Sequence, residues 1–174
     1  SMAGASSSAA EAPNLEAYVA AQISLTDHLT AQLSLAVRDP LDRIIGETLI
    51  DAIDETGYMR DDISEFAERL GVSVSRVEKV LSVIQTFDPS GIGARDLAEC
   101  LAIQLKELDR YDPAMQALIG SLPLLAKRDF VQLKIICGVD QEDLNGRLSE
   151  IRQLDPKPGR VFGTSDIQPV IPDV

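Results

Sequence analysis

A block of this chain recurs 67 positions later, and this repeat limits the possible folds more than any other feature of the sequence. The pair Asp88-Pro89 returns as Asp155-Pro156, and Gly71-Val72 returns as Gly138-Val139. Further matches at the same spacing are Asp62 with Asp129, Leu81-Ser82 with Leu148-Ser149, and Ile84 with Ile151. A repeated unit that holds no catalytic residues is typical of a binding scaffold, not of an enzyme.

The repeat extends upstream at a slightly larger spacing. The segment 29–33 resembles 101–105, which lies 72 positions further on, and Asp39-Pro40 matches Asp112-Pro113 at 73 positions. We infer a duplicated unit of a long helix, an Asp-Pro start, a short helix, a Gly-Val turn, a helix and an Asp-Pro break. The fall in spacing predicts a shorter second helix or turn in the second copy.

Apolar residues at helical spacing mark the individual helices. Ala, Leu, Ile and Val supply most of the apolar content and aromatic residues only 4%, which favours helices over sheets. Asp followed by Pro suits a helix start, because Asp can cap and Pro fits the first turn. Pro123 is expected to kink or end its helix. The predicted helices span 15–37, 40–53, 62–70, 74–84, 94–108, 113–125, 129–137 and 140–154.

These elements predict an all-α protein of two small helical bundles in tandem, with helix-turn-helix-like packing and an internal duplication. We expect a first helical subdomain over 15–92 and a second over 93–156. Pro156, Pro158, Pro169 and Pro172 predict an extended C-terminal tail over 157–174. Residues 1–14 are mostly small and polar, and are expected to be a disordered linker that starts with an expression scar.

Charge and cysteine usage limit the function. The net charge of −12 argues against DNA binding by this chain alone, because nonspecific DNA affinity comes mainly from Lys and Arg. An acidic chain suits docking to a basic protein surface. No apolar run is long enough for a membrane span, so we expect a soluble chain with no membrane partner. Cys100 and Cys137 lie in apolar helical patterns and are expected to be buried thiols in a reducing cytoplasm.

Residues 66–77 have the pattern of a helix-turn-helix. Gly71 permits a left-handed turn, and Ser73 caps the next helix. The alternatives are DNA recognition, through side chains such as Ser75, Arg76 and Lys79, and the same packing used only structurally. Surrounding carboxylates would repel phosphate. They are Asp51, Asp54, Glu55, Asp61, Asp62, Glu65 and Glu68.

The sequence offers little evidence for an enzyme active site. Gly91-Ile92-Gly93 resembles half of a phosphate loop, but no strand pattern precedes it, so helix capping is favoured. His28 is the only histidine, and no cluster has metal-ligand spacing. The pairs Asp54-Glu55 and Asp61-Asp62 imitate catalytic carboxylates but suit solvated helix ends better. We therefore expect no cofactor, no metal and no enzymatic activity.

Residues 85–101, with the sequence QTFDPSGIGARDLAECL, closely resemble a signature of the bacterial sigma-54 (sigma-N) factors, the alternative sigma subunits of RNA polymerase. Segments 29–33, 49–58, 154–159 and 170–174 resemble the same family. The resemblance implies a core-binding domain that docks on the beta and beta-prime subunits of core polymerase in the bacterial cytoplasm. It places binding of promoter DNA and the response to an ATP-dependent activator outside this fragment, which we expect to be monomeric.

Two sets of site residues follow from these arguments. The candidate partner-binding residues are Asp54, Glu55, Asp61, Asp62, Glu65, Lys157 and Arg160. The signature residues lie at the expected joint between the two copies and are expected to be structural, with Arg95 and Asp96 forming a salt bridge that orients the subdomains. These signature residues are Phe87, Asp88, Pro89, Gly91, Gly93, Arg95 and Asp96. A helix-turn-helix DNA-binding regulator is the alternative.

Overall fold

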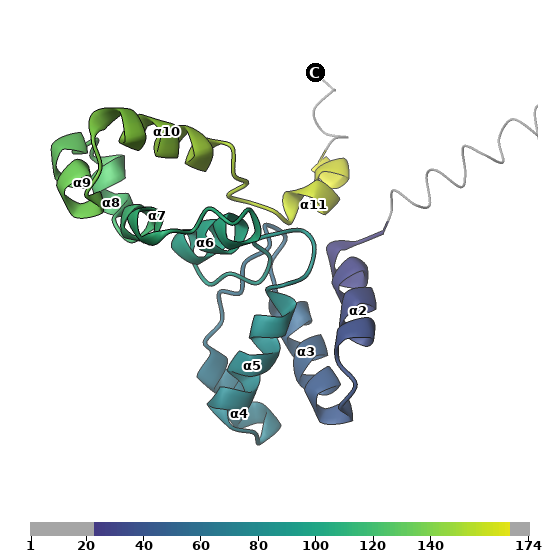
Figure 1. Ribbon diagram of the computed structural model, residues 1–174. Helices are drawn as coiled ribbons and strands as arrows, with labels where there is room; N and C mark the ends of the chain where they lie inside the picture. The colour runs from purple at the N-terminus through teal and green to yellow at the C-terminus, as the bar shows by residue number, and fades with distance from the viewer. Residues whose placement is uncertain (1–22, 168–174) are drawn as a thin grey trace, which may run out of the picture.

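The computed structural model describes residues 23–167, and this part of the chain is helical without strands. The prediction of an all-α fold is therefore confirmed. No helix in this range is long and apolar enough to cross a membrane. Figure 1 labels the helices as α2 (Leu25–Ala36), α3 (Pro40–Ala52), α4 (Ile63–Leu70), α5 (Val74–Ile84), α6 (Leu97–Glu107), α7 (Pro113–Ile119), α8 (Leu122–Ala126), α9 (Phe130–Cys137), α10 (Gln141–Arg152) and α11 (Arg160–Ile167).

Most helix boundaries follow the local signals in the sequence. Asp39 and Asp112 cap α3 and α7, and each is followed by Pro in the first turn. The helices α4 and α9 both end at a glycine in the left-handed conformation, with φ of 68° at Gly71 and 69° at Gly138. At 7 residues α7 is shorter than the 13-residue α3, while the duplication from which a shorter helix or turn was inferred stays a prediction.

Three predicted elements are wrong. One continuous helix over 15–37 is not formed, because the Ser24 hydroxyl accepts the Asp27 amide and starts α2 at Leu25; residues 15–22 lie outside the described part. The predicted helix over 113–125 is two helices, and Pro123 lies in the first turn of α8, where its missing N–H costs little. The tail is helical over 160–167 instead of extended. The predicted linker over 1–14 also lies outside the described residues.

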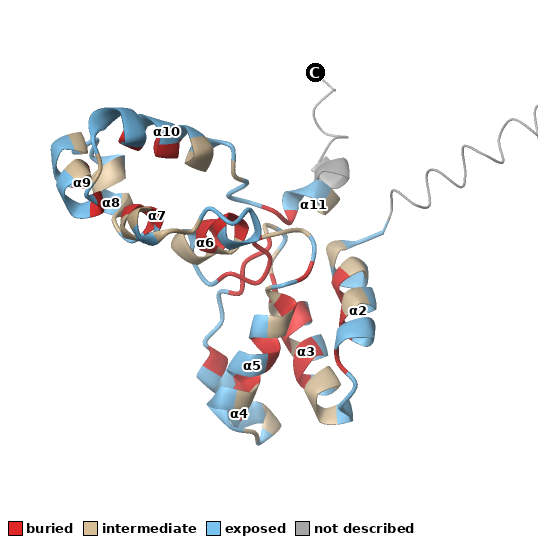
Figure 2. Ribbon diagram, in the orientation of Figure 1, coloured by how far each residue is buried: buried red, intermediate tan, exposed pale blue. Residues whose placement is uncertain are grey.

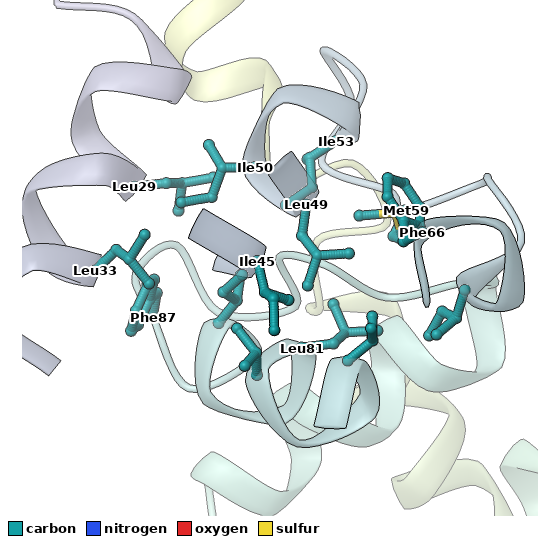
Figure 3. Close-up of a cluster of buried hydrophobic side chains, with 14 of the residues drawn as sticks. Leu29, Leu33, Ile45, Leu49, Ile50, Ile53, Met59, Phe66, Leu81 and Phe87 are labelled. Carbon is teal, nitrogen blue, oxygen red and sulfur yellow. The ribbon is translucent and has the colours of Figure 1, made fainter. Parts of the chain in front are cut away.

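Two separate clusters of buried side chains hold the helices together. Figure 2 shows the buried residues along the inward faces of α2, α3 and α5, and Figure 3 shows the first cluster in detail. Burial of each large apolar side chain contributes about 1.5–3 kcal/mol. The first cluster includes Leu29, Leu33, Ile45, Leu49, Phe66, Leu81, Ile84, Phe87 and Ile92. The second includes Leu101, Leu105, Met115, Leu118, Leu133, Leu144 and Leu148.

Both cysteines are buried free thiols, as expected. Cys137 belongs to the second cluster. Cys100 packs with Tyr58 and Ala94 in a third, smaller group. Burial raises the pKa of both thiols, so neither is activated as a nucleophile.

The repeated sequence positions make matching hydrogen bonds. The Gln32 side-chain amide donates to the Asp88 carbonyl at 2.7 Å and accepts from the Asp88 amide at 2.9 Å. The Gln104 side chain bonds the carbonyl and amide of Asp155 in the same way, at 2.6 and 2.8 Å. We call these two arrangements the glutamine clamps. One clamp ties α2 to Asp88-Pro89, and the other ties α6 to Asp155-Pro156.

The helices are arranged as a compact group with a projecting arm. Figure 1 shows α2 to α5 side by side in the lower part of the molecule. The helices α6 to α10 project to one side, and α10 runs back along the arm toward α11. The rings of His28 on α2 and Phe162 on α11 lie 4.9 Å apart, which places the C-terminal helix beside the first group.

Candidate functional site

Three segments that are distant in the sequence meet where the arm joins the first group of helices. They are the turn 54–59, the signature loop 87–96 and the segment 155–159, and together we call them the joint. The Met59 amide donates to the Ala94 carbonyl, and the Gly93 amide donates to the Gly57 carbonyl, each at 2.8 Å. These bonds pair the turn with the signature loop along a short parallel stretch.

The segment after the second Asp-Pro pair packs on the other side of the same turn. The Gly159 amide donates to the Thr56 carbonyl at 2.9 Å, and the Tyr58 hydroxyl donates to the Pro156 carbonyl at 2.7 Å. A Cβ on Gly159 would lie 2.6 Å from the Glu55 carbonyl oxygen, so only glycine allows this approach. Both ends of the arm are thus bound to one turn.

The signature residues Phe87, Asp88 and Gly91 are part of this packing. Phe87 is buried in the first cluster. Asp88, followed by Pro89 through a cis peptide bond, is held by its glutamine clamp, and its carboxylate bonds the His28 ring at 3.0 Å. Gly91 has a φ of 97°, and a Cβ there would lie 2.7 Å from the side-chain nitrogen of Gln104. The loop therefore contacts the helix that carries the second clamp.

Arg95 and Asp96 do not form the expected bridge between subdomains. The Arg95 guanidinium pairs with Glu99 on the following helix, at 2.8 Å. Asp96 caps α6 by accepting the Glu99 amide. Burial would raise the pKa of Glu99, but hydrogen bonds from Arg95 lower it below its usual value. Both residues instead organise the start of α6, and the prediction of an orienting Arg95–Asp96 salt bridge is wrong.

Asp54 builds the turn of the joint. Its carboxylate accepts the Thr56 hydroxyl at 2.6 Å and the amides of Thr56 and Tyr58 at 2.9 and 3.0 Å. Burial opposes ionisation, but these bonds and Arg60 outweigh it and lower the pKa of Asp54. The carboxylate is therefore charged and bound internally. Its neighbour Glu55 is exposed and borders a hollow with Gly159.

A shallow groove beside the joint carries two of the other predicted residues. It has a volume of about 360 Å³ and holds Asp61, Asp62 and Glu78 with Arg60 and Arg95. We call it the acidic groove. Its full lining is Met59, Arg60, Asp61, Asp62, Ile63, Ser64, Val74, Glu78 and Arg95.

The cations of the acidic groove already have internal partners. Arg60 lies over the Tyr58 ring at 4.4 Å and pairs with Asp54 at 3.5 Å, while Arg95 pairs with Glu99. Asp61 and Glu78 are exposed and make no ion pair within the described residues. The groove consequently presents uncompensated negative charge to solvent.

The remaining predicted residues lie on either side of the joint. Asp62 caps α4 through the Ser64 amide, and Glu65 is exposed on the same helix. Lys157 and Arg160 are exposed on the tail. The structure thus groups Asp61 and Asp62 in one groove, and places Glu55 with the tail instead.

The helix-turn-helix unit is formed, but its Arg76 side chain is already ion-paired within the protein. The Arg76 guanidinium bonds Asp39 at 2.9 Å and Asp42 at 2.8 Å, which ties α5 to the start of α3. Arg147 holds Asp112 and Asp143 in a similar way on α10. Arg76 is therefore a structural residue and is not free to bind phosphate.

The sequence interpretation missed both glutamine clamps, the tail contact of Tyr58 and the contribution of Glu78. The clamps had a usable signal, since Gln32 and Gln104 occupy matched positions of the repeat. Within residues 23–167, no group of three or more His, Cys, Asp or Glu side chains could hold a metal ion.

Taken together, these features define an all-helical binding scaffold with a buried joint and an acidic exposed groove. Residues 14–174 match the family model described as "Sigma-54 factor, core binding domain". The chain belongs to this family of sigma-54 core-binding domains.

Several curated proteins can be aligned with nearly the whole chain. It is 56% identical over 171 residues to the RNA polymerase sigma-54 factor 2 of Bradyrhizobium diazoefficiens, covering 98% of this chain and 32% of that protein. It is 56% identical over 161 residues to the RNA polymerase sigma-54 factor of Azorhizobium caulinodans, covering 92% and 31%. The sigma-54 factor of Sinorhizobium fredii is 52% identical over 175 residues, covering 100% and 34%. The chain spans about a third of the length of these curated relatives.

Proposed function

We propose that this domain binds core RNA polymerase as the docking part of a sigma-54-type transcription initiation factor. The family match over residues 14–174 and relatives that are named RNA polymerase sigma-54 factors support this function. The domain acts as a non-catalytic scaffold in the bacterial cytoplasm and meets the beta and beta-prime subunits as a monomer. In the complete factor, other segments bind promoter DNA and respond to an ATP-dependent activator.

The acidic groove is the observation that carries the docking proposal. Asp61 and Glu78 are exposed, and the neighbouring Arg60 and Arg95 are neutralised by Asp54 and Glu99. Uncompensated carboxylates at a surface steer a basic partner and fix its orientation more than they add raw affinity. Glu55 and Glu65 extend this negative surface, and the exposed Lys157 and Arg160 offer a separate contact for an acidic patch of polymerase.

The joint gives these contacts a fixed geometry. We propose that residues 15–92 and 93–156 act as two helical subdomains. The signature loop and the segment 155–159 both bond the turn 54–59, which supports a defined angle between them. The signature residues thus act structurally, by setting how the two contact surfaces are presented.

Binding of the chain to purified core polymerase tests the proposal. Co-migration on native gels or size exclusion at micromolar concentration is expected, and its absence would contradict the function. The variant Asp61→Lys with Glu78→Lys should weaken binding by about tenfold at low salt, mainly through slower association. Asp62 is left unchanged because it caps α4.

A matched control separates local from overall charge. Glu107→Lys with Glu142→Lys makes the same change of net charge at two exposed positions outside the acidic groove. This control should retain most of the affinity. Equal losses in both variants would show that net charge alone matters and that the groove is not the contact.

Binding of DNA is the competing outcome. A gel shift with the isolated chain at low salt would favour the helix-turn-helix regulator. The structure argues against it, because Arg76 is bound by Asp39 and Asp42, and carboxylates surround the second helix of the unit.

A further inference from the structure

An apolar groove with arginines at its rim lies on the arm, between α8, the start of α9 and the C-terminal half of α10. It has a volume of about 440 Å³, within the range of about 300–1,000 Å³ that is usual for ligand pockets. Figure 1 shows α8 and α9 at the tip of the arm and α10 running back from them toward α11, and the groove is lined by the later part of α10. We call this feature the arm groove, and its lining is Leu125, Arg128, Phe130, Leu148, Ile151 and Arg152.

The two arginines of the arm groove are available to a partner. Both are exposed, and neither makes an ion pair with any residue in the range 23–167. The carboxylates that adjoin them in sequence are engaged elsewhere. Asp129 caps α9 by accepting the Gln132 amide, and Glu150 binds Arg110 at 2.8 Å. The rim is therefore a local positive site on a chain of net charge −12.

Arg128 is held in a conformation that favours glycine. Its φ is 60°, in the left-handed region, where Gly71 and Gly138 adopt 68° and 69°. A Cβ in this region is strained by the neighbouring carbonyl, and non-glycine residues there often mark functional positions. The turn itself needs only the backbone, since the Arg128 amide donates to the Leu125 carbonyl. Asp109 ends α6 in the same conformation, with a φ of 59°, so this geometry is a helix-ending turn that fixes where the Arg128 side chain leaves the backbone.

We propose that the arm groove binds an acidic amphipathic helix of the partner protein. Apolar side chains at helical spacing would enter between Phe130, Leu148 and Ile151, and flanking carboxylates would pair with Arg128 and Arg152. The helix-in-groove mode fits because the described residues offer no sheet edge to which an extended peptide could add. A nucleic acid would leave the apolar floor uncovered, so a protein segment is favoured.

This inference rests on the proposed function, since the helix would belong to core polymerase. It adds a second contact, opposite in charge to the acidic groove and located on different helices. A partner that contacted both would be held in one orientation, because the two grooves share no lining residue.

A peptide titration tests the arm groove directly. The probe is a short synthetic helical peptide with Leu at i, i+3 and i+7 and Glu at the flanking positions, added to the isotope-labelled chain. Amide shifts should concentrate around Leu125, Phe130 and Ile151. A peptide with Lys in place of Glu should bind about fivefold to tenfold more weakly, and a short DNA duplex should not displace the acidic peptide. Equal binding of both peptides, shifts elsewhere, or displacement by DNA would overturn the proposal.

Two variants distinguish binding from folding. Arg128→Gly removes the guanidinium but relieves the strained backbone, so it should keep or raise the thermal midpoint while weakening the acidic peptide severalfold. Arg152→Glu should weaken the acidic peptide and strengthen the lysine peptide. Ile135→Ser is the matched control, because Ile135 is 68% exposed on α9 but does not line the groove. Unchanged affinity in both arginine variants would refute the assignment.

Binding to core polymerase is an independent test. If the wild-type chain binds polymerase and Arg152→Glu does not weaken it, the arm groove is wrong while the docking function stands. If the wild-type chain does not bind polymerase, the docking function fails, and the peptide titration still decides whether the groove takes an acidic helix.

Discussion

The glutamine clamps allow a matched experiment within one chain, because Gln32 and Gln104 make the same two bonds in different surroundings. Gln104 is 7% exposed, whereas Gln32 is half-buried and its bonds to Asp88 face solvent. Truncation of either residue to Ala removes one donor and one acceptor from an Asp-Pro backbone. Water can replace them at Asp88 far more easily than at Asp155.

The expected magnitudes follow from this difference. A hydrogen bond that water can replace contributes about 0.5–1.5 kcal/mol, and an unsatisfied buried group costs about 1–3 kcal/mol. We therefore expect Gln32→Ala to lower the free energy of unfolding by about 1 kcal/mol. For Gln104→Ala, we expect about 2–3 kcal/mol, because a buried side chain is lost and the part-buried Asp155 carbonyl keeps only the weak Cys100 thiol bond.

Equilibrium unfolding in urea, followed by circular dichroism, measures both values. Gln104→Met is the control for packing, since it keeps the length of the side chain but cannot replace either bond. It should recover only a small part of the loss. Hydrogen exchange of the Asp155 amide should accelerate in both variants of Gln104.

Two results would refute this reasoning. Equal destabilisation by Gln32→Ala and Gln104→Ala would show that burial does not control the strength of the clamp. Full recovery in Gln104→Met would show that packing, and not the pair of hydrogen bonds, accounts for the effect.

Three further predictions concern the joint, the helix ends and the acid response. Gly91→Ala should lower the free energy of unfolding by about 2–4 kcal/mol, because the residue has a positive φ and a Cβ would contact buried side-chain atoms. Gly71→Ala should cost only about 1 kcal/mol, because no atom lies within 4 Å of a Cβ there. Thermal unfolding measures both changes. Tyr58→Phe should cost about 0.5–1.5 kcal/mol through the lost bond to the tail, with faster exchange of the tail amides and an unchanged second cluster. Arg147, mainly by its hydrogen bond, lowers the folded-state pKa of Asp112 below the ordinary 3.8. The interaction therefore stabilises the fold above pH 3.8, and this contribution is lost as the pH falls through the folded-state pKa. Arg147→Gln should therefore flatten the decline of the urea midpoint on acidification below about pH 4, and an undiminished slope would contradict that role.

Helix starts and stops were predictable because their causes lie within a few residues. Asp39-Pro40 and Asp112-Pro113 begin helices, since a capping carboxylate and a missing amide both suit the first turn. Gly71 ends its helix because only glycine adopts the left-handed conformation without strain. The tail was misread for the same local reason, since its prolines suggested extension although Arg160 to Ile167 contain none.

The contacts that build the joint could not be predicted from local pattern. Tyr58 bonds a carbonyl 98 residues away, and Gln104 bonds one 51 residues away. The candidate site has this limit only in part. Asp54 and Asp61 are both acidic residues near one turn, but the first is bound by three internal donors and the second is exposed. Asp54 opens the Asp-Glu-Thr-Gly turn, where an Asp side chain commonly binds the backbone two residues on, and this local signal was not used.

The joint also holds the two ends of the arm together at one place in the fold. The arm leaves the turn 54–59 through Gly93 and Ala94 and returns to it through Pro156 and Gly159. A segment whose two ends meet at one place can be cut, permuted or exchanged with little effect on the rest of the protein. A chain cleaved in the loop between α9 and α10 should therefore stay assembled, and arms from related factors should be interchangeable at these two ends, which would let the acidic groove and the arm groove be varied independently.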